Sequence, residues 1–200
     1  MTRVWIVFAA FIGLSGCMQM KPDHFMETAP KLVLEDYFTG ETRAWGLFED
    51  RFGNLRRQFA VDITGTWDGR ELVLDERFQY SDGERDRRVW TIEKINATTY
   101  EGRADDVIGR AEGKAYGNAL NWRYDLDLKV GDGTLRVHFN DWMFLNADNV
   151  LLNRARVSKF GVEIGTVTLA FMKVPADETA SQSAVNDWRG GAVNAKAANQ

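Results

Sequence analysis

The 200-residue chain predicts an all-β protein, an antiparallel up-and-down meander closed into a lipocalin-like barrel of about ten strands. Apolar and polar residues alternate through most of residues 32–174, and turn dipeptides recur at short intervals. No long helical period follows the N-terminal apolar stretch. Because short antiparallel strands leave unpaired edges, we expect the meander to close on itself.

The clearest strand is residues 121–130, "NWRYDLDLKV", which has one apolar and one charged face. Dipeptides typical of hairpin turns separate this segment and the other predicted strands. These turns are Gly53-Asn54, Asp68-Gly69, Asp82-Gly83 and the run Gly131-Asp132-Gly133.

Turn length predicts which residues face one another across each hairpin. A three-residue loop at residues 81–83 places Glu76 opposite Arg88. A two-residue loop at residues 68–69 places Val61 opposite Glu76. Both registers put apolar side chains on one continuous face.

The third hairpin, with a four-residue loop at residues 131–134, adds to this face and places Tyr124 opposite Asp141. The last hairpin is expected to turn at residues 160–161. Its pattern leaves open whether its arginines point inward.

Polar residues on the apolar face are the candidate ligand-binding residues: Glu76, Arg88, Asp106, Tyr124 and Asp141. A carboxylate inside a barrel is costly unless paired, and arginine offers a bidentate partner. In one interpretation, Glu76 and Arg88 form a buried structural ion pair that fixes register. In the other, they are the polar end of a ligand cavity, with Arg88 meeting an acyl carboxylate or a phosphate.

Two successive predicted strands present small residues on one side, and this leaves volume to be filled. The set is Gly102 and Ala104, followed after the turn by Ala111, Gly113, Ala115 and Gly117. These residues either line a cavity or allow bending while tryptophans fill the space. A barrel of this size can hold one small ligand.

The N-terminus predicts a place in the cell envelope. Arg3 precedes an apolar run over residues 4–14, which as a helix spans about 16 Å and is too short for a hydrocarbon core. Leu14-Ser15-Gly16-Cys17 resembles the bacterial lipobox, which implies cleavage before Cys17 and acylation of this single cysteine. Met18-Gln19 lacks the aspartate of inner-membrane retention, so we expect an outer-membrane lipoprotein facing the periplasm.

These features divide the chain into a signal peptide (1–16), a lipidated tether (17–31), the β-barrel (32–174) and a disordered tail (175–200). The partner that they imply is a membrane, reached through acylated Cys17.

Composition and spacing disfavour several classes of function. The formal net charge is −4 without a basic stripe, so nucleic acid is not an expected partner. No histidine or cysteine spacing indicates a metal or cofactor, and no catalytic set is assigned. We expect a module that binds a lipid-like or other apolar ligand. The alternatives are an assembly lipoprotein docking a protein partner, and a lipid-acting isomerase or hydrolase with Glu76 as base, which a close Arg88 would disfavour.

Four segments of the chain carry a resemblance to a known family. They are "AWGLFEDRFGNLRRQF", "LVLDERFQYSDGERDRRVWTI", "YEGRADDVIGRAEGKAYGNALNWRY" and "FNDWMFLNADNVLLNRARVSKFGVEIGTVTLAF". They are similar to a family of bacterial lipoproteins, domain of unknown function 3833 (DUF3833). The resemblance covers residues 34–173. It implies a lipid-anchored envelope protein without an assigned activity, and therefore no catalytic residue can be carried over.

Overall fold

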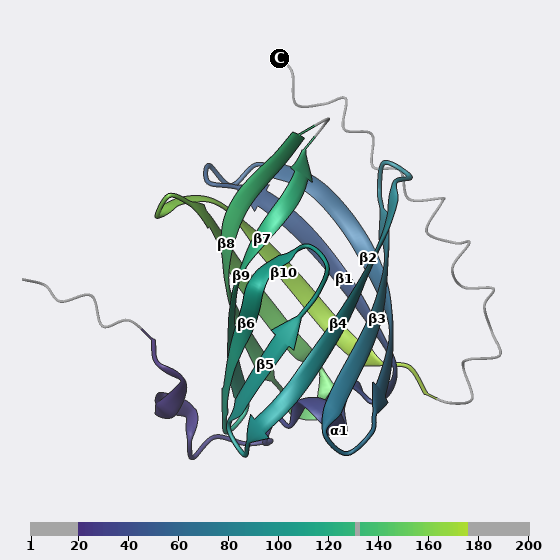
Figure 1. The fold of residues 1–200 in the computed structure, drawn as a ribbon, viewed down its shortest axis with the longest axis vertical. Coiled ribbons are helices and arrows are strands. Elements are labelled where there is room, and N and C mark those ends of the chain that lie inside the picture. Colours follow the sequence, from purple (N-terminus) through teal and green to yellow (C-terminus); the bar gives the residue numbers. More distant parts are fainter. Residues whose placement is uncertain (1–19, 131–132, 176–200) are drawn as a thin grey trace, which may run out of the picture.

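A computed structural model describes residues 20–130 and 133–175 and places ten antiparallel strands of this part of the chain in one closed barrel (Figure 1). Each strand pairs with its neighbours in sequence, and β1 closes the barrel against β10. The predicted fold class is confirmed. The strands are β1 (Gly40–Asp50), β2 (Leu55–Trp67), β3 (Glu71–Tyr80), β4 (Arg85–Asn96), β5 (Thr99–Arg103), β6 (Val107–Tyr116), β7 (Ala119–Val130), β8 (Gly133–Leu145), β9 (Leu151–Lys159) and β10 (Val162–Lys173).

The short helix α1 (Leu34–Phe38) closes one end of the barrel, at the bottom of Figure 1. Leu34 and Phe38 are buried in the core, and the Tyr37 hydroxyl donates to the Phe171 carbonyl at 3.1 Å. At Gly65 an added Cβ would lie 1.9 Å from the Phe38 carbonyl oxygen, so glycine lets the helix pass. A helix of five residues depends on such packing, and periodicity did not predict it.

A polar network also holds α1 in place. The Glu35 carboxylate accepts hydrogen bonds from the Lys94 ammonium and, at 2.9 Å, from the Tyr100 hydroxyl. These contacts hold the pKa of Glu35 below its ordinary value against the opposing effect of burial. Helix α1 is therefore held at the closed end both by apolar packing in the core and by the hydrogen-bonded Glu35 carboxylate.

Residues 20–31, part of the predicted tether, lie against the outside of the barrel at its closed end (Figure 1). They contain the 3₁₀-helix η1 (Pro22–Phe25), and the Phe25 ring packs 5.4 Å from that of Phe144. The Leu32 amide then donates to the Gly117 carbonyl. The closed sheet, its plug and its core lie within residues 32–173, so a chain that begins at Met20 retains all of them. Among the described helices, none is long and apolar enough to cross a membrane.

The small-residue strands β5 and β6 are filled by a tryptophan from β7. A Cβ added at Gly102 would lie 2.5 Å from the Trp122 ring, and one added at Gly113 would lie at the same distance from it. The Trp90 ring meets Trp122 edge-on, with centroids 5.7 Å apart. Of the two predicted alternatives, a cavity wall or space filled by tryptophan, the second is found at Gly102 and Gly113.

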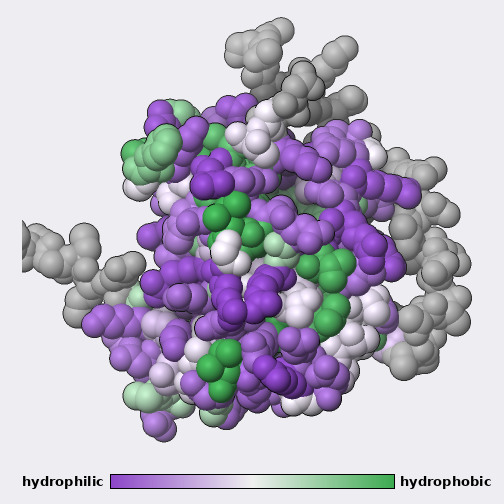
Figure 2. Space-filling view, in the orientation of Figure 1, coloured by the Kyte–Doolittle hydropathy of each residue, from purple (hydrophilic) through white to green (hydrophobic). Residues whose placement is uncertain are grey.

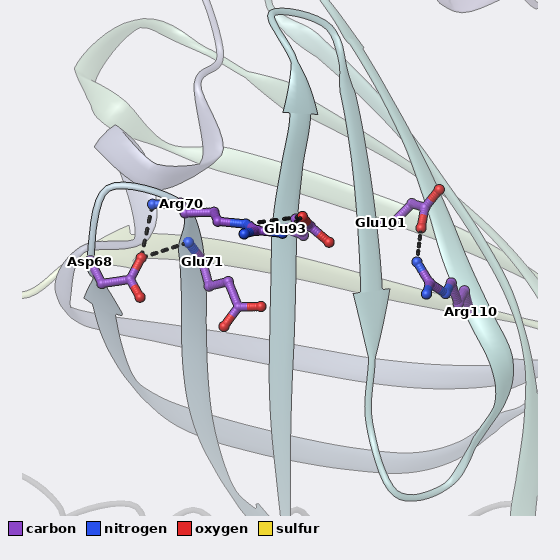
Figure 3. A network of polar contacts seen from close by, with 6 residues as sticks. All are labelled: Asp68, Arg70, Glu71, Glu93, Glu101 and Arg110. Carbon is purple, nitrogen blue, oxygen red and sulfur yellow. Dashed lines mark hydrogen bonds and ion pairs between the residues drawn. The ribbon is translucent and has the colours of Figure 1, made fainter.

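The predicted β3–β4 register is confirmed, with Glu76 opposite Arg88. The β2–β3 register was wrong by two residues, because Glu76 faces Ile63 rather than Val61. The Asp68 carboxylate accepts hydrogen bonds from the backbone amides of Arg70 and Glu71, at 2.8 and 2.7 Å (Figure 3). This Asx-type turn lengthens the connection.

Figure 3 also shows the outer face beyond this turn, where arginines pair with glutamates across neighbouring strands. The Arg70 guanidinium lies 2.6 Å from Glu93, and Arg110 contacts Glu101. The Arg70 and Arg110 side chains are 76 % and 50 % exposed, and exposed pairs of this kind contribute little stability.

The β7–β8 register was also wrong by two residues. Val130 pairs with Gly133, so only two residues connect the strands and the ladder is longer than predicted. Asp141 consequently faces Trp122 rather than Tyr124. A shift of two residues leaves every side chain on its predicted face. The last hairpin turns at residues 160–161 as predicted, and a register shift in β10 leaves both arginines of β9 on the outer surface.

Candidate functional site

A cavity of about 430 Å³ runs along the barrel interior. Its lining begins with Leu34 and Phe38 of α1 and ends with Arg56, Arg57 and Lys129 at the opposite end. Most of the wall between them is aliphatic or aromatic. This volume and lining are typical of sites for small apolar ligands.

Four of the five predicted ligand-binding residues line this cavity. Glu76, Arg88, Tyr124 and Asp141 come from β3, β4, β7 and β8. Asp106 lies in the connection between β5 and β6 and reaches the cluster through Arg88. Four strands and one connection thus bring all five residues into one polar cluster.

Arg88 pairs with Asp106 and not with Glu76, which corrects the predicted ion pair. The Arg88 Nε lies 3.0 Å and its Nη2 2.7 Å from Asp106 Oδ2. The bond is possible because β5 is only five residues long, so that the β5–β6 connection, which carries Asp106, reaches Arg88 part-way along the barrel. Arg88 still acts on Glu76 through its charge.

Glu76 faces the cavity and forms no ion pair among the described residues. Burial raises the pKa of Glu76 to about 7, and the neighbouring Asp106 carboxylate acts in the same direction. The Arg88 charge and a hydrogen bond from Trp90 oppose the increase without cancelling it. Glu76 can therefore be neutral or charged near physiological pH.

Asp141 is a second carboxyl group of this kind and is only 6 % exposed. Burial raises the pKa of Asp141 to about 7, although Asn153 Nδ2 donates to its Oδ2 at 3.4 Å. Within the described part of the chain, the Oδ1 atoms of Asp141 and Asn153 have no hydrogen-bond partner. The sequence analysis did not identify Asn153. The feature that could have revealed it is a polar amide at an inward-facing position of β9.

Tyr124 joins the polar cluster to the aromatic wall. Its ring stacks on Phe139, with centroids 5.0 Å apart, and meets Trp90 edge-on at 5.3 Å. Burial raises the pKa of the Tyr124 hydroxyl well above its ordinary value. Tyr124 therefore stays protonated and can donate a hydrogen bond.

The wall near the open end is aromatic and carries one fixed cation. The rings of Phe59, Phe78 and Tyr80 lie within about 6 Å of one another. The Arg57 guanidinium lies 3.5 Å from the Tyr80 ring centroid and 2.9 Å from Asp82. The alternating pattern of the sequence predicted an apolar inner face, but not that these three rings would contact one another at the open end of the barrel.

The cluster as a whole favours a ligand group that donates hydrogen bonds. Its carboxyl groups are Glu76, Asp106 and Asp141, and its guanidinium, from Arg88, is already bound in bidentate form. In the part of the chain that the structure describes, no group of three or more His, Cys, Asp or Glu side chains could hold a metal ion.

The model of a family described as proteins of unknown function, DUF3833, matches residues 11–173. The chain belongs to the DUF3833 family. The match covers every strand of the barrel, so the cavity and its polar cluster lie inside the segment that defines DUF3833. A comparison with curated proteins finds no match.

Proposed function

We propose that this DUF3833 protein binds a lipid-like ligand inside the barrel, with the hydrocarbon part along the apolar wall and the polar end at the Glu76–Asp141 cluster. The observation that supports this most is the cavity of about 430 Å³ with two carboxyl groups of raised pKa at its side. A solidly packed core would leave no reason to keep these groups inside the barrel, because burying them is costly.

The polar end of the ligand is a hydrogen-bond donor, such as a hydroxyl or an amine. A fatty carboxylate or a phosphate would meet three carboxyl groups and one guanidinium that Asp106 already binds. Above about pH 7, where Glu76 and Asp141 are charged, like charges at close range cost several kcal/mol. A donor would instead meet the carboxyl groups of Glu76 and Asp141, which line the cavity.

Native mass spectrometry tests this proposal. The protein is extracted with organic solvent and then offered hexadecanol, hexadecylamine and hexadecanoate separately at pH 8. The alcohol and the amine are expected to bind at least about tenfold more tightly than the carboxylate. The variant Glu76→Gln/Asp141→Asn is expected to reduce this preference, since it removes the charges that repel the carboxylate. No binding of any chain to the folded protein would contradict the proposal.

We also propose that the protein is anchored in the outer membrane, facing the periplasm, by acyl chains on Cys17. This residue lies outside the described residues, and the support is the Leu14-Ser15-Gly16-Cys17 motif. More than one acyl chain gives a stable anchor. Mass spectrometry of the N-terminal peptide from fractionated membranes should find an acylated cysteine as the first residue. An unmodified peptide that retains residues 1–16 would refute the anchor.

A further inference from the structure

We propose that the open end of the barrel docks on an anionic lipid bilayer through the tips of two neighbouring hairpins, β1–β2 and β9–β10. Asp50 pairs with Gly165 at the end of the β1–β10 ladder, and the Arg51 amide donates to the Ile164 carbonyl. The two tips therefore lie side by side, at the end of the barrel opposite α1 (Figure 1).

Both tips carry exposed apolar side chains. Phe52 and Leu55 in the first hairpin are 75 % and 53 % exposed, and Phe160 and Val162 in the second are 96 % and 56 % exposed. Figure 2 shows hydrophobic colour at these tips, at the upper left, surrounded by hydrophilic side chains. Four large apolar groups on one rim form a concentrated patch, which is typical of a contact surface.

The backbone conformation of Phe160 is unfavourable for a bulky residue, and its exposed ring does not pack in the barrel. Its backbone φ is +50°, in the left-handed region that a bulky side chain rarely adopts. An asparagine or glycine would suit this two-residue turn better. Because the ring is also almost fully in water, folding does not account for the residue. Strain of this kind points to a function outside the folded chain.

The charges around the patch fit an anionic bilayer. A basic residue precedes each tip phenylalanine, and the Arg51 guanidinium lies 4.7 Å from the Phe52 ring, as the Lys159 ammonium lies 5.3 Å from the Phe160 ring. Arg56, Arg57 and Arg156 of these hairpins form ion pairs with carboxylates. Arg51 and Lys159 form no ion pair among the described residues, so the cations beside the two rings are available to anionic headgroups. Aromatic rings beside basic groups are typical of membrane-interface segments.

The position of the patch connects it with the cavity. Arg56 and Arg57 of the β1–β2 hairpin also line the cavity, so a bilayer against the tips would face the open end of the barrel. That the bilayer supplies the ligand rests on the proposed function. The docking itself does not require any ligand in the cavity.

The experiment uses the chain that begins at Met20, which retains the whole barrel and contains no cysteine. A single thiol is introduced by Val162→Cys at the tip, or by Ile95→Cys, a 46 % exposed position at the closed end, as the matched control. Each is labelled with nitrobenzoxadiazole and mixed with vesicles of phosphatidylcholine and phosphatidylglycerol, about 7:3. Spin-labelled acyl chains are expected to quench the tip label, while aqueous iodide quenches the control.

The aromatic variant Phe52→Ser/Phe160→Asn should reduce partitioning at least about tenfold, because it removes the largest apolar groups. The basic variant Arg51→Ser/Lys159→Ser should reduce it several-fold at low salt, and salt should have the same effect on the unsubstituted tip. The aromatic variant is expected to bind hexadecanol as before, which separates loss of docking from loss of the cavity function.

Three results would overturn the proposal. A tip label that iodide quenches equally with and without vesicles would exclude penetration. Equal partitioning into pure phosphatidylcholine would exclude the anionic surface. A tip label that is already protected without vesicles, at concentrations where the protein sediments as a dimer, would assign the patch to a second copy of this chain.

Discussion

The buried carboxyl of Asp141 contributes to the pH dependence of stability with a sign opposite to that of Glu35, whose pKa is lowered. Burial raises the pKa of Asp141 from the ordinary 3.8 to about 7. Between these two values the folded state holds a proton at Asp141 that the unfolded chain releases, so the contribution of this group to stability falls as pH rises. The variant Asp141→Asn removes the charge, so it should be more stable than the wild type at pH 8 and similar to it at pH 4. The shift of about three units sets an upper bound of about 4 kcal/mol.

Urea unfolding followed by tryptophan fluorescence measures this difference, since Trp90 and Trp122 line the same cavity. The free energy of unfolding is determined at pH 4 and at pH 8 for the wild type, for Asp141→Asn and for Asp105→Asn in the exposed β5–β6 connection. The control should follow the wild type. A difference in stability between Asp141→Asn and the wild type that is the same at pH 4 and at pH 8 would refute the reasoning.

Three further changes test the packing of the barrel. Gly113→Ala should cost about 1–3 kcal/mol in urea unfolding, because its Cβ would lie 2.5 Å from the Trp122 ring; no loss would exclude this tight packing. Lys94→Met should destabilise the barrel by about 1–3 kcal/mol at pH 7, since it leaves the buried Glu35 carboxylate without its cation, and an unchanged urea midpoint would contradict that. Phe160→Asn should raise the thermal midpoint, because asparagine relieves about 1 kcal/mol of backbone strain; a lower midpoint would assign a structural role to the ring.

The sequence predicted the barrel and the polar cluster because both depend on strand alternation. Inward polar residues stand out against an apolar face whichever register the hairpins adopt. Two hairpins were nevertheless placed wrongly by two residues. The Asp68-Gly69 dipeptide does not show that Asp68 binds the amides of its own turn. In the β7–β8 hairpin, the glycines were assigned to the loop, whereas the ladder continues to Val130 and Gly133. An error of two residues keeps the face, which is why Asp141 was still correctly placed inside.

Features that depend on three-dimensional placement were missed. Helix α1 is five residues long and is held by tertiary contacts, so it has no period to detect. The partner of Arg88 was assigned to Glu76 because the two face each other across a hairpin. The actual partner, Asp106, comes from the β5–β6 connection, whose position depends on the shortness of β5.

The most direct test of ligand binding is quenching of tryptophan fluorescence by hexadecanol brominated on its chain. Ala155 is buried and lines the cavity, and Ala155→Phe would fill part of that volume. The folded wild type is expected to show saturable quenching at one ligand per chain, and the folded Ala155→Phe variant is expected to lose most of it. Quenching that does not saturate, or that is equal in both proteins, would contradict a binding site inside the barrel.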